Sequence, residues 1–229
     1  MLLSSQLHST WLLIDTTGQG CHLGLMHQGQ LIQQSDMQPQ SHTKRILPMI
    51  ESLLVQVKLS PKDIQAIIYT QGPGSFTGVR VGVSVVQGLA FSLSIPTLGI
   101  STLMALAWQG SLATDQRKIG VLIDARMSQI YWAVYDFAEG ALPLVNDCLT
   151  NLEQITAAGL PSCISGDVHL LPNADVNTES MLYSPQTSVD IKALFNLAEI
   201  GISKGFLAWD QVIPLPIYLR NDVACLPKK

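Results

Sequence analysis

The chain has 229 residues, of which 47% are apolar and 13% charged, and its net charge is −4. This length allows one large domain or two small lobes that each bury a core, and the charged fraction is about half of the usual ~25%, as expected for a large core or for a surface that a partner covers. The thirteen basic residues form no cluster larger than a pair, so the chain lacks the basic stripe of a stand-alone nucleic-acid binder. If RNA is involved, another subunit is expected to supply most of the phosphate contacts.

The cysteines are isolated from one another and form no C-x-x-C pair and no Cys/His zinc pattern. We interpret them as buried or idle thiols of a reducing cytoplasm. The start of the chain has no signal-peptide pattern, and no run of 18 apolar residues occurs. The sequence therefore predicts a cytoplasmic protein without a membrane segment. The four cysteines are Cys21, Cys148, Cys163 and Cys225.

The first part of the chain predicts three antiparallel strands and one helix. The strands are expected at 11–14, 21–26 and 31–34, because turn residues separate short apolar runs. A helix is expected to open at Ser41–Thr43, since apolar residues then recur at 3.6 spacing up to Val57. Residues 1–10 precede the first strand and receive no role.

The remaining elements repeat this plan. A strand at 64–69, a glycine loop and a helix at 79–93 are followed by a strand at 95–100 and a helix at 103–110. A second hairpin at 120–135 follows, and then a helix at 151–158, a strand at 163–167, a helix at 189–203 and an extended tail at 214–220. Two tandem α/β units predict two lobes, residues 1–106 and 107–229, as in actin and the sugar kinases.

The glycine loop at 71–82 is the most informative stretch. A strand runs into it and a helix runs out, so backbone N–H groups at a positive helix end are expected there, a seat for phosphate or carboxylate. The spacing matches neither a P-loop, which needs a lysine, nor a G-x-G-x-x-G dinucleotide loop. The favoured alternative is a structural turn that packs a helix closely on a sheet. The candidate anion-binding residues are Asp15, Thr16, Gly72, Gly74, Ser75, Thr77 and Gly78.

The helix at 79–93 is apolar on two faces, which is typical of a helix sandwiched between two neighbours. Its glycines would let another backbone approach closely, at about 1 kcal/mol each in helix propensity. We expect this helix and the one before it to form a surface on which a partner protein docks; the alternative is burial within one subunit. The expected interface residues are His42, Leu47, Leu54, Gly78, Arg80, Gly82, Val85 and Leu89.

Nearly the whole chain resembles the TsaB (YeaZ) family, which acts in making threonylcarbamoyladenosine in tRNA. The strongest match is the loop QGPGSFTGVRVG at 71–82. Shorter matches follow in the right order along the chain. They are LIDTT at 13–17, His42 with LPMI at 47–50, Pro96 with GISTL at 99–103, DAR at 124–126 with YWA at 131–133, and Pro216 with YLR at 218–220.

The resemblance implies an actin-like (ASKHA) fold of two lobes, each a mixed sheet with flanking helices. It implies a non-catalytic scaffold that binds no cofactor or metal, pairs with the active paralogue TsaD, and joins the small ATPase TsaE. TsaD transfers a threonylcarbamoyl group to the adenosine 3′ of the anticodon, so tRNA is met only through the complex. Our hypothesis is that the surface on the two helices serves both a homodimer of the chain alone and the heterodimer with TsaD, so that the two are mutually exclusive.

The rival functions are a glycoprotease-type metallopeptidase and a kinase-like nucleotide-binding enzyme. TsaD carries two histidines at i and i+4 on one helix face, which suit a metal ion. Thr102 and Leu106 stand at the corresponding places here, and leucine cannot bind a metal. The Ser-Gly-Gly phosphate turn expected in the second lobe is replaced by Asp124-Ala125-Arg126. Weak nucleotide binding in the cleft stays open.

Overall fold

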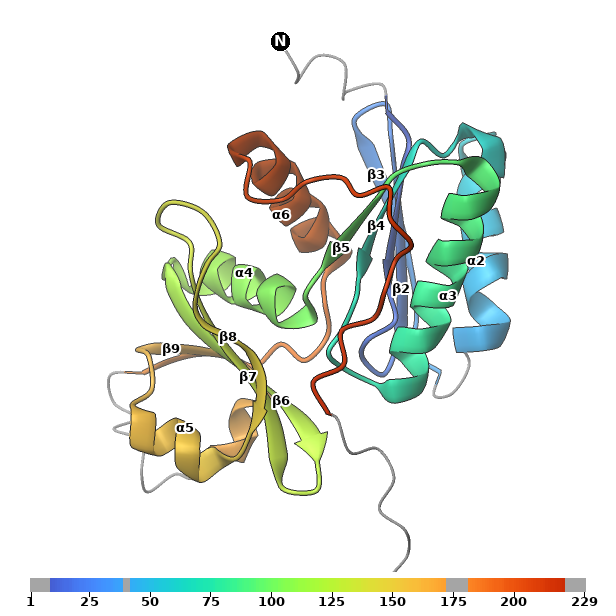
Figure 1. Ribbon diagram of the computed structural model, residues 1–229. Coiled ribbons are helices and arrows are strands. Elements are labelled where there is room, and N and C mark those ends of the chain that lie inside the picture. Colours follow the sequence, from blue (N-terminus) through green and yellow to red (C-terminus); the bar gives the residue numbers. More distant parts are fainter. Residues whose placement is uncertain (1–8, 39–41, 172–180, 221–229) are drawn as a thin grey trace, which may run out of the picture.

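A computed structural model describes residues 9–38, 42–171 and 181–220, and these form two lobes, each built on a five-stranded mixed sheet (Figure 1). The first sheet has the order β3-β2-β1-β4-β5, and consists of β1 (Trp11–Asp15), β2 (Cys21–His27), β3 (Gln30–Asp36), β4 (Ala66–Thr70) and β5 (Thr97–Ile100). The second has the order β10-β9-β6-β7-β8, and consists of β6 (Lys118–Arg126), β7 (Gln129–Asp136), β8 (Leu142–Thr150), β9 (Cys163–Gly166) and β10 (Leu182–Ser184).

The two sheets share one pairing pattern. In the first, β1 pairs antiparallel with β2 and parallel with β4. In the second, β6 pairs antiparallel with β7 and parallel with β9. The actin-like plan of two duplicated α/β lobes, which the tandem order of elements predicts, is confirmed. Residues 1–8 and Cys225, both considered in the sequence, lie outside the described residues.

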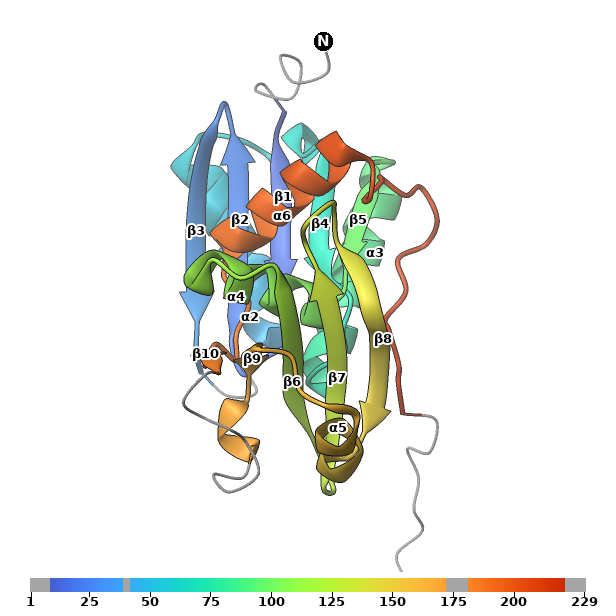
Figure 2. The ribbon, with the colours of Figure 1, turned by 90° about the vertical axis from the view of Figure 1, so that its left-hand side faces the viewer.

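Helices cover both faces of the first sheet. On one face lie α2 (His42–Gln56) and α3 (Phe76–Leu93), which pack on the even-numbered side chains of β1. On the other lies α6 (Ile191–Lys204), which contacts β1 and β2, and Figure 2 shows α6 lying across β1. Helix α4 (Thr102–Thr114) packs between α6 and the second sheet. The short α5 (Leu152–Ala158) belongs to the second lobe, and short 3₁₀ turns occupy Pro61–Asp63 and Val168–Leu170.

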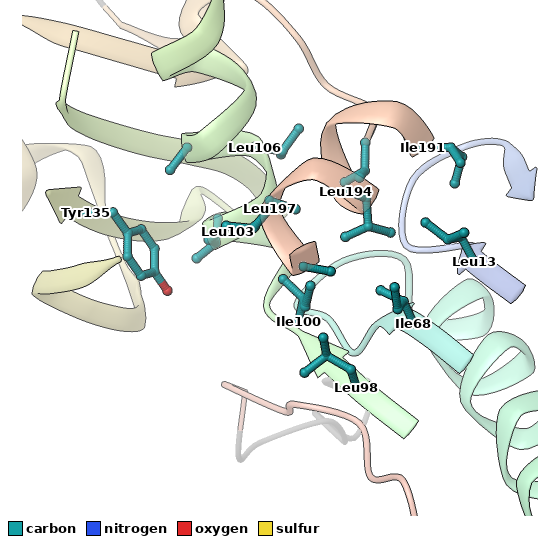
Figure 3. Packing of buried hydrophobic residues seen from close by; sticks show 14 of the residues in the cluster. Leu13, Ile68, Leu98, Ile100, Leu103, Leu106, Tyr135, Ile191, Leu194 and Leu197 are labelled. Carbon is teal, nitrogen blue, oxygen red and sulfur yellow. The ribbon is translucent and has the colours of Figure 1, made fainter. Parts of the chain in front are cut away.

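The core between the lobes is formed by α4 and α6. Leu103 and Leu106 of α4 face Leu194 and Leu197 of α6 (Figure 3), and all four side chains are buried. A helix with apolar residues on all sides is usually buried, and α4 is largely buried from Thr102 to Gly110 while Leu112 in its last turn is exposed. Because each fully buried leucine contributes about 1.5–3 kcal/mol, this contact holds the lobes together at their base.

The structure corrects several element boundaries. Helix α3 begins at Phe76, three residues before the predicted start, and Ser75 is its N-cap, its Oγ accepting from the Gly78 amide at 3.4 Å. Thr77, another of the candidate anion-binding residues, is the second residue of the helix. Strands β8 and β10 are not predicted by the sequence, because β8 exposes its apolar residues and contains Pro143, while β10 has only three residues.

Helix α3 has 18 residues and a mean hydropathy of 1.4, so by length and composition alone it is apolar enough to cross a bilayer. The core helices of globular proteins meet the same criterion. Here Val79, Val83 and Val86 are buried in the core shared with α2 and β4. Val85 and Leu89 are partly buried against this core, and Phe76 and Phe91 face outward.

Candidate functional site

The turn after β1 is organised by a buried carboxylate. Asp15 has no exposed surface, and its Oδ1 accepts hydrogen bonds from the Thr17 amide at 3.1 Å, the Thr17 hydroxyl at 2.6 Å and the Thr70 hydroxyl at 2.5 Å. Its Oδ2 has no partner in the part of the chain that the structure describes. The carboxylate thus fixes its own turn and ties β1 to β4.

The two threonines that bind Asp15 are absent from the sequence-based candidates. Thr17 is a local partner, two residues along the chain. Thr70 lies 55 residues away and arrives only because β4 pairs parallel with β1. A threonine that ends a buried strand next to the glycine loop is the signal that points to Thr70.

The glycines of the loop allow the Thr16–Thr17 turn to lie directly against α3. A Cβ on Gly74 would lie 2.4 Å from the Thr17 carbonyl oxygen, and one on Gly78 only 2.0 Å from that of Thr16. A Cβ on Gly82 would lie 2.2 Å from the Thr16 Oγ1, which donates to the Gly78 carbonyl at 2.7 Å. Each distance is shorter than a Cβ contact can be. The Thr16–Thr17 turn of the same chain therefore occupies the space beside the α3 glycines, where the sequence predicts the backbone of a partner.

The positive end of α3 remains open. Ser75, Phe76 and Thr77 are exposed, so the N-terminal end of the helix, where its dipole is positive, lies at the surface, although the Gly78 amide is already held by the Ser75 Oγ. Arg80 lies one turn further, with its guanidinium 3.6 Å above the centre of the Phe76 ring. Gly72 lies behind this end, where its left-handed φ of +99° suits glycine and its carbonyl accepts from the Thr102 amide at 2.9 Å.

The second lobe offers a charged hairpin at the place of a phosphate turn. Asp124 accepts a hydrogen bond from the Arg126 amide at 2.7 Å, and the two side chains form an exposed ion pair at 3.1 Å. Asp167 holds the Asp124 amide at 2.8 Å. The hairpin satisfies its own charges and presents no glycine-rich amide cradle.

The positions of the TsaD histidines are buried here. Thr102 and Leu106 both lie on α4, and Leu106 is part of the core between the lobes. Among the described residues, no group of three or more His, Cys, Asp or Glu side chains could hold a metal ion. Burial raises the pKa of the Cys21 thiol to about 12, and the nearby Asp15 and Asp36 carboxylates add to the shift, so this thiol is not an activated nucleophile.

The expected interface residues separate into exposed and buried ones. Leu47 is 56% exposed and Arg80 is exposed, but Leu54 is only 2% exposed and belongs to the core. Val85 and Leu89 are half-buried at the edge of α3, and the side chain of His42 lies outside the described residues. Sequence reasoning missed three exposed apolar residues on these helices, Val55, Phe76 and Phe91.

Comparison with known proteins identifies the family of the chain. Residues 36–205 match the family model of TsaD, described as tRNA N6-adenosine threonylcarbamoyltransferase. The chain is 41% identical over 134 residues to the tRNA threonylcarbamoyladenosine biosynthesis protein TsaB of Escherichia coli, covering 57% of each chain, and 34% identical over 137 residues to that of Bacillus subtilis, covering 59% of each. The chain thus spans a little over half the length of these curated relatives.

A solved structure extends the likeness across the fold. YeaZ from Pseudomonas aeruginosa superposes with a TM-score of 0.78 and 28% identity, covering 92% of this chain and 100% of that one. Two duplicated mixed sheets around a shared helical core define an actin-like two-lobed protein. The chain belongs to the TsaD family, and within it to the TsaB (YeaZ) family that its sequence motifs indicate.

Proposed function

We propose that this protein is a non-catalytic subunit that supports threonylcarbamoyl transfer to the adenosine 3′ of the anticodon in tRNA. It pairs with a TsaD protein, which carries out the chemistry, and the pair recruits the TsaE ATPase. The names of the curated relatives support the pathway, since these are biosynthesis proteins for the same modified nucleoside. In this proposal the protein is cytoplasmic, forms a homodimer when alone and contacts tRNA only within the complex.

The observation that carries the proposal is the outer surface of α2 and α3. Large apolar side chains stand exposed on both helices, and Phe91 is 90% exposed. Large exposed apolar residues on two neighbouring helices support a protein-binding surface there. We define the docking surface as the exposed or half-buried Leu47, Val55, Phe76, Arg80, Val85, Leu89 and Phe91.

The site chemistry supports a scaffold over the two enzymatic alternatives. A metallopeptidase needs ligands where Thr102 and Leu106 are buried. A kinase-like enzyme needs a free acid in the cleft, whereas Oδ1 of Asp15 is engaged by three donors in its own lobe. Because the N-terminal end of α3 is open, weak nucleotide binding should be tested by titrating the purified protein with ATP. Metal analysis of the purified protein tests the metallopeptidase alternative.

The deciding experiment places a charge on the docking surface without disturbing the fold. Phe91→Glu changes a side chain that the monomer leaves in solvent, so the thermal midpoint should stay within a few degrees of the wild type. Binding to the TsaD of the same organism, measured by analytical ultracentrifugation, should weaken by at least about 100-fold, because a desolvated carboxylate at an apolar contact costs several kcal/mol.

The matched control is Leu142→Glu, the same kind of change on the exposed edge strand β8 of the second lobe. This variant should bind TsaD as the wild type does and support tRNA modification in a reconstituted reaction. Normal pairing by the Phe91 variant would refute the docking surface. Threonylcarbamoyl transfer by the isolated protein would refute the non-catalytic role.

A further inference from the structure

The segment after α6 contacts both lobes at several points, and we name residues 209–220 the C-terminal strap. It begins where the Trp209 ring meets Trp11 edge-on, with ring centres 5.2 Å apart. Asp210 then pairs with Thr97 of β5 through two backbone hydrogen bonds of 2.8 and 2.7 Å. The strap is therefore anchored to the edge of the first sheet.

From this anchor the strap runs beside α3 toward the second lobe (Figures 1 and 2). Gln87 of α3 donates its side-chain amide to the Pro214 carbonyl at 2.6 Å. Two turns earlier in the helix, the Arg80 Nε donates to the Tyr218 hydroxyl at 2.8 Å. These contacts hold the strap in one direction along the helix.

Between these contacts the strap crosses the glycine loop. The Ile217 amide donates to the Gln71 carbonyl at 2.7 Å. A Cβ on Gly72 would make a tight contact of 3.0 Å with the Ile217 carbonyl oxygen, and the φ of +99° is a conformation that favours glycine.

The strap then reaches the second lobe through one guanidinium group. Arg220 Nη2 donates to the Ala125 carbonyl at 2.9 Å and to the Gln129 Oε1 at 2.8 Å. These acceptors flank the tip of the β6–β7 hairpin, where Arg126, Met127 and Ser128 all have left-handed φ angles between 56° and 66°. Non-glycine residues rarely adopt this conformation, and three in a row depend on contacts that hold the turn from outside.

We propose that the C-terminal strap is a conformational brace that fixes the second lobe against the first. The lobes already share the core formed by α4 and α6, and the tip of the β6–β7 hairpin lies outside this core. The strap holds this tip by joining the glycine loop at Gln71 to the hairpin at Ala125. This inference rests only on the contacts of the strap and holds whether or not the proposed function is correct.

The test releases the brace at its far end. In Arg220→Gln the shorter neutral amide cannot span both acceptors, so amide hydrogen exchange in residues 124–130 should speed up about tenfold. The control is Arg126→Gln, which removes a cation from the same hairpin but leaves the strap contacts, since its side chain is exposed and pairs only with Asp124. Its exchange should stay within about twofold of the wild type.

A second variant releases the brace from the first lobe. Gly72→Ala displaces Ile217, and a brace that acts as one unit should pass this change to the hairpin. Exchange should therefore rise in residues 124–130 as well as in the glycine loop. A rise confined to residues 71–77 would show that the strap merely covers the loop, and would overturn the proposal.

The distance between the lobes provides an independent test of the brace. Double electron–electron resonance measures this distance between spin labels attached at Ser84→Cys on α3 and Glu139→Cys in the second lobe, which are both exposed positions. Cys148 and Cys225 are replaced by serine in these proteins. Arg220→Gln should broaden the distance distribution, and Arg126→Gln should leave it as in the wild type. Equal distributions in both variants would overturn the brace, even if the hairpin exchange rises.

Discussion

Two glycines of α3 should respond in opposite ways to the same substitution. At Gly78 an alanine Cβ would lie 2.0 Å from the Thr16 carbonyl oxygen, and the Thr16 hydroxyl donates to the Gly78 carbonyl at 2.7 Å. At Gly88 nothing lies within 4 Å of an added Cβ, and the residue is exposed. The helix gains propensity from either change, but only Gly78→Ala must push a neighbouring turn away.

The magnitudes follow from these contacts. Overpacking at Gly78 costs about 1–3 kcal/mol, and straining the hydrogen bond costs about 1 kcal/mol more. Alanine returns about 1 kcal/mol of helix propensity, so Gly78→Ala should lower the free energy of unfolding by about 1–3 kcal/mol. Gly88→Ala should raise it by up to about 1 kcal/mol for the same propensity reason.

Urea unfolding followed by circular dichroism measures both variants against the wild type. The two midpoints should lie on opposite sides of the wild-type value, about 1 M urea apart for an unfolding slope of about 2–3 kcal/mol/M. The slope itself should not change, because neither variant alters the surface exposed on unfolding. A Gly78→Ala protein as stable as Gly88→Ala would refute the close packing of the Thr16–Thr17 turn on α3.

Three other outcomes follow from buried polar groups. Thr70→Val keeps the side-chain shape but removes a donor to the Asp15 carboxylate, so urea unfolding should show a loss of about 1.5–3 kcal/mol. Burial raises the pKa of Asp147, although Ser101 and Tyr135 donate hydrogen bonds to its carboxylate. The folded state therefore binds the Asp147 proton more tightly than the unfolded state does. As the pH rises from the unfolded pKa to the folded pKa of Asp147, this residue makes the free energy of unfolding fall. Asp147→Asn should flatten that decline in unfolding curves measured between pH 4 and 7, and an unchanged slope would contradict the assignment. The Cys21 thiol, with its pKa raised to about 12, should react with a thiol reagent at pH 8 only after the protein unfolds, which mass spectrometry of the labelled peptide can establish.

The sequence predicts those helices and strands whose apolar residues follow the pattern of buried positions. Strands β1 and β4 are buried on both faces and stand out as short apolar runs. Strand β8 lies at the edge of its sheet with Leu142, Leu144 and Val145 exposed, so no face of it follows the pattern of a core strand. Its existence depends on pairing with β7, which is a tertiary property.

The site shows the same division between local and distant information. The glycine loop, Asp15 and the N-cap Ser75 are found because each depends on neighbours in the chain. The Thr70 hydroxyl and the Arg220 guanidinium act on residues 55 and 95 positions away, and no local spacing encodes such contacts. Leu54 is expected at the interface together with Leu47, but it is only 2% exposed and belongs to the buried side of α2.

The glycine pattern of α3 therefore serves contact within the chain, whereas helix periodicity indicates contact with a partner. Small residues four apart permit any backbone to approach, and the sequence alone does not say whose. Here the Thr16–Thr17 turn of the same chain takes the place, which moves the expected partner contact outward to side chains such as Leu47 and Phe91. A charge introduced beside Gly82 would test folding and docking together, whereas Phe91→Glu tests docking alone, because the monomer makes almost no use of that ring.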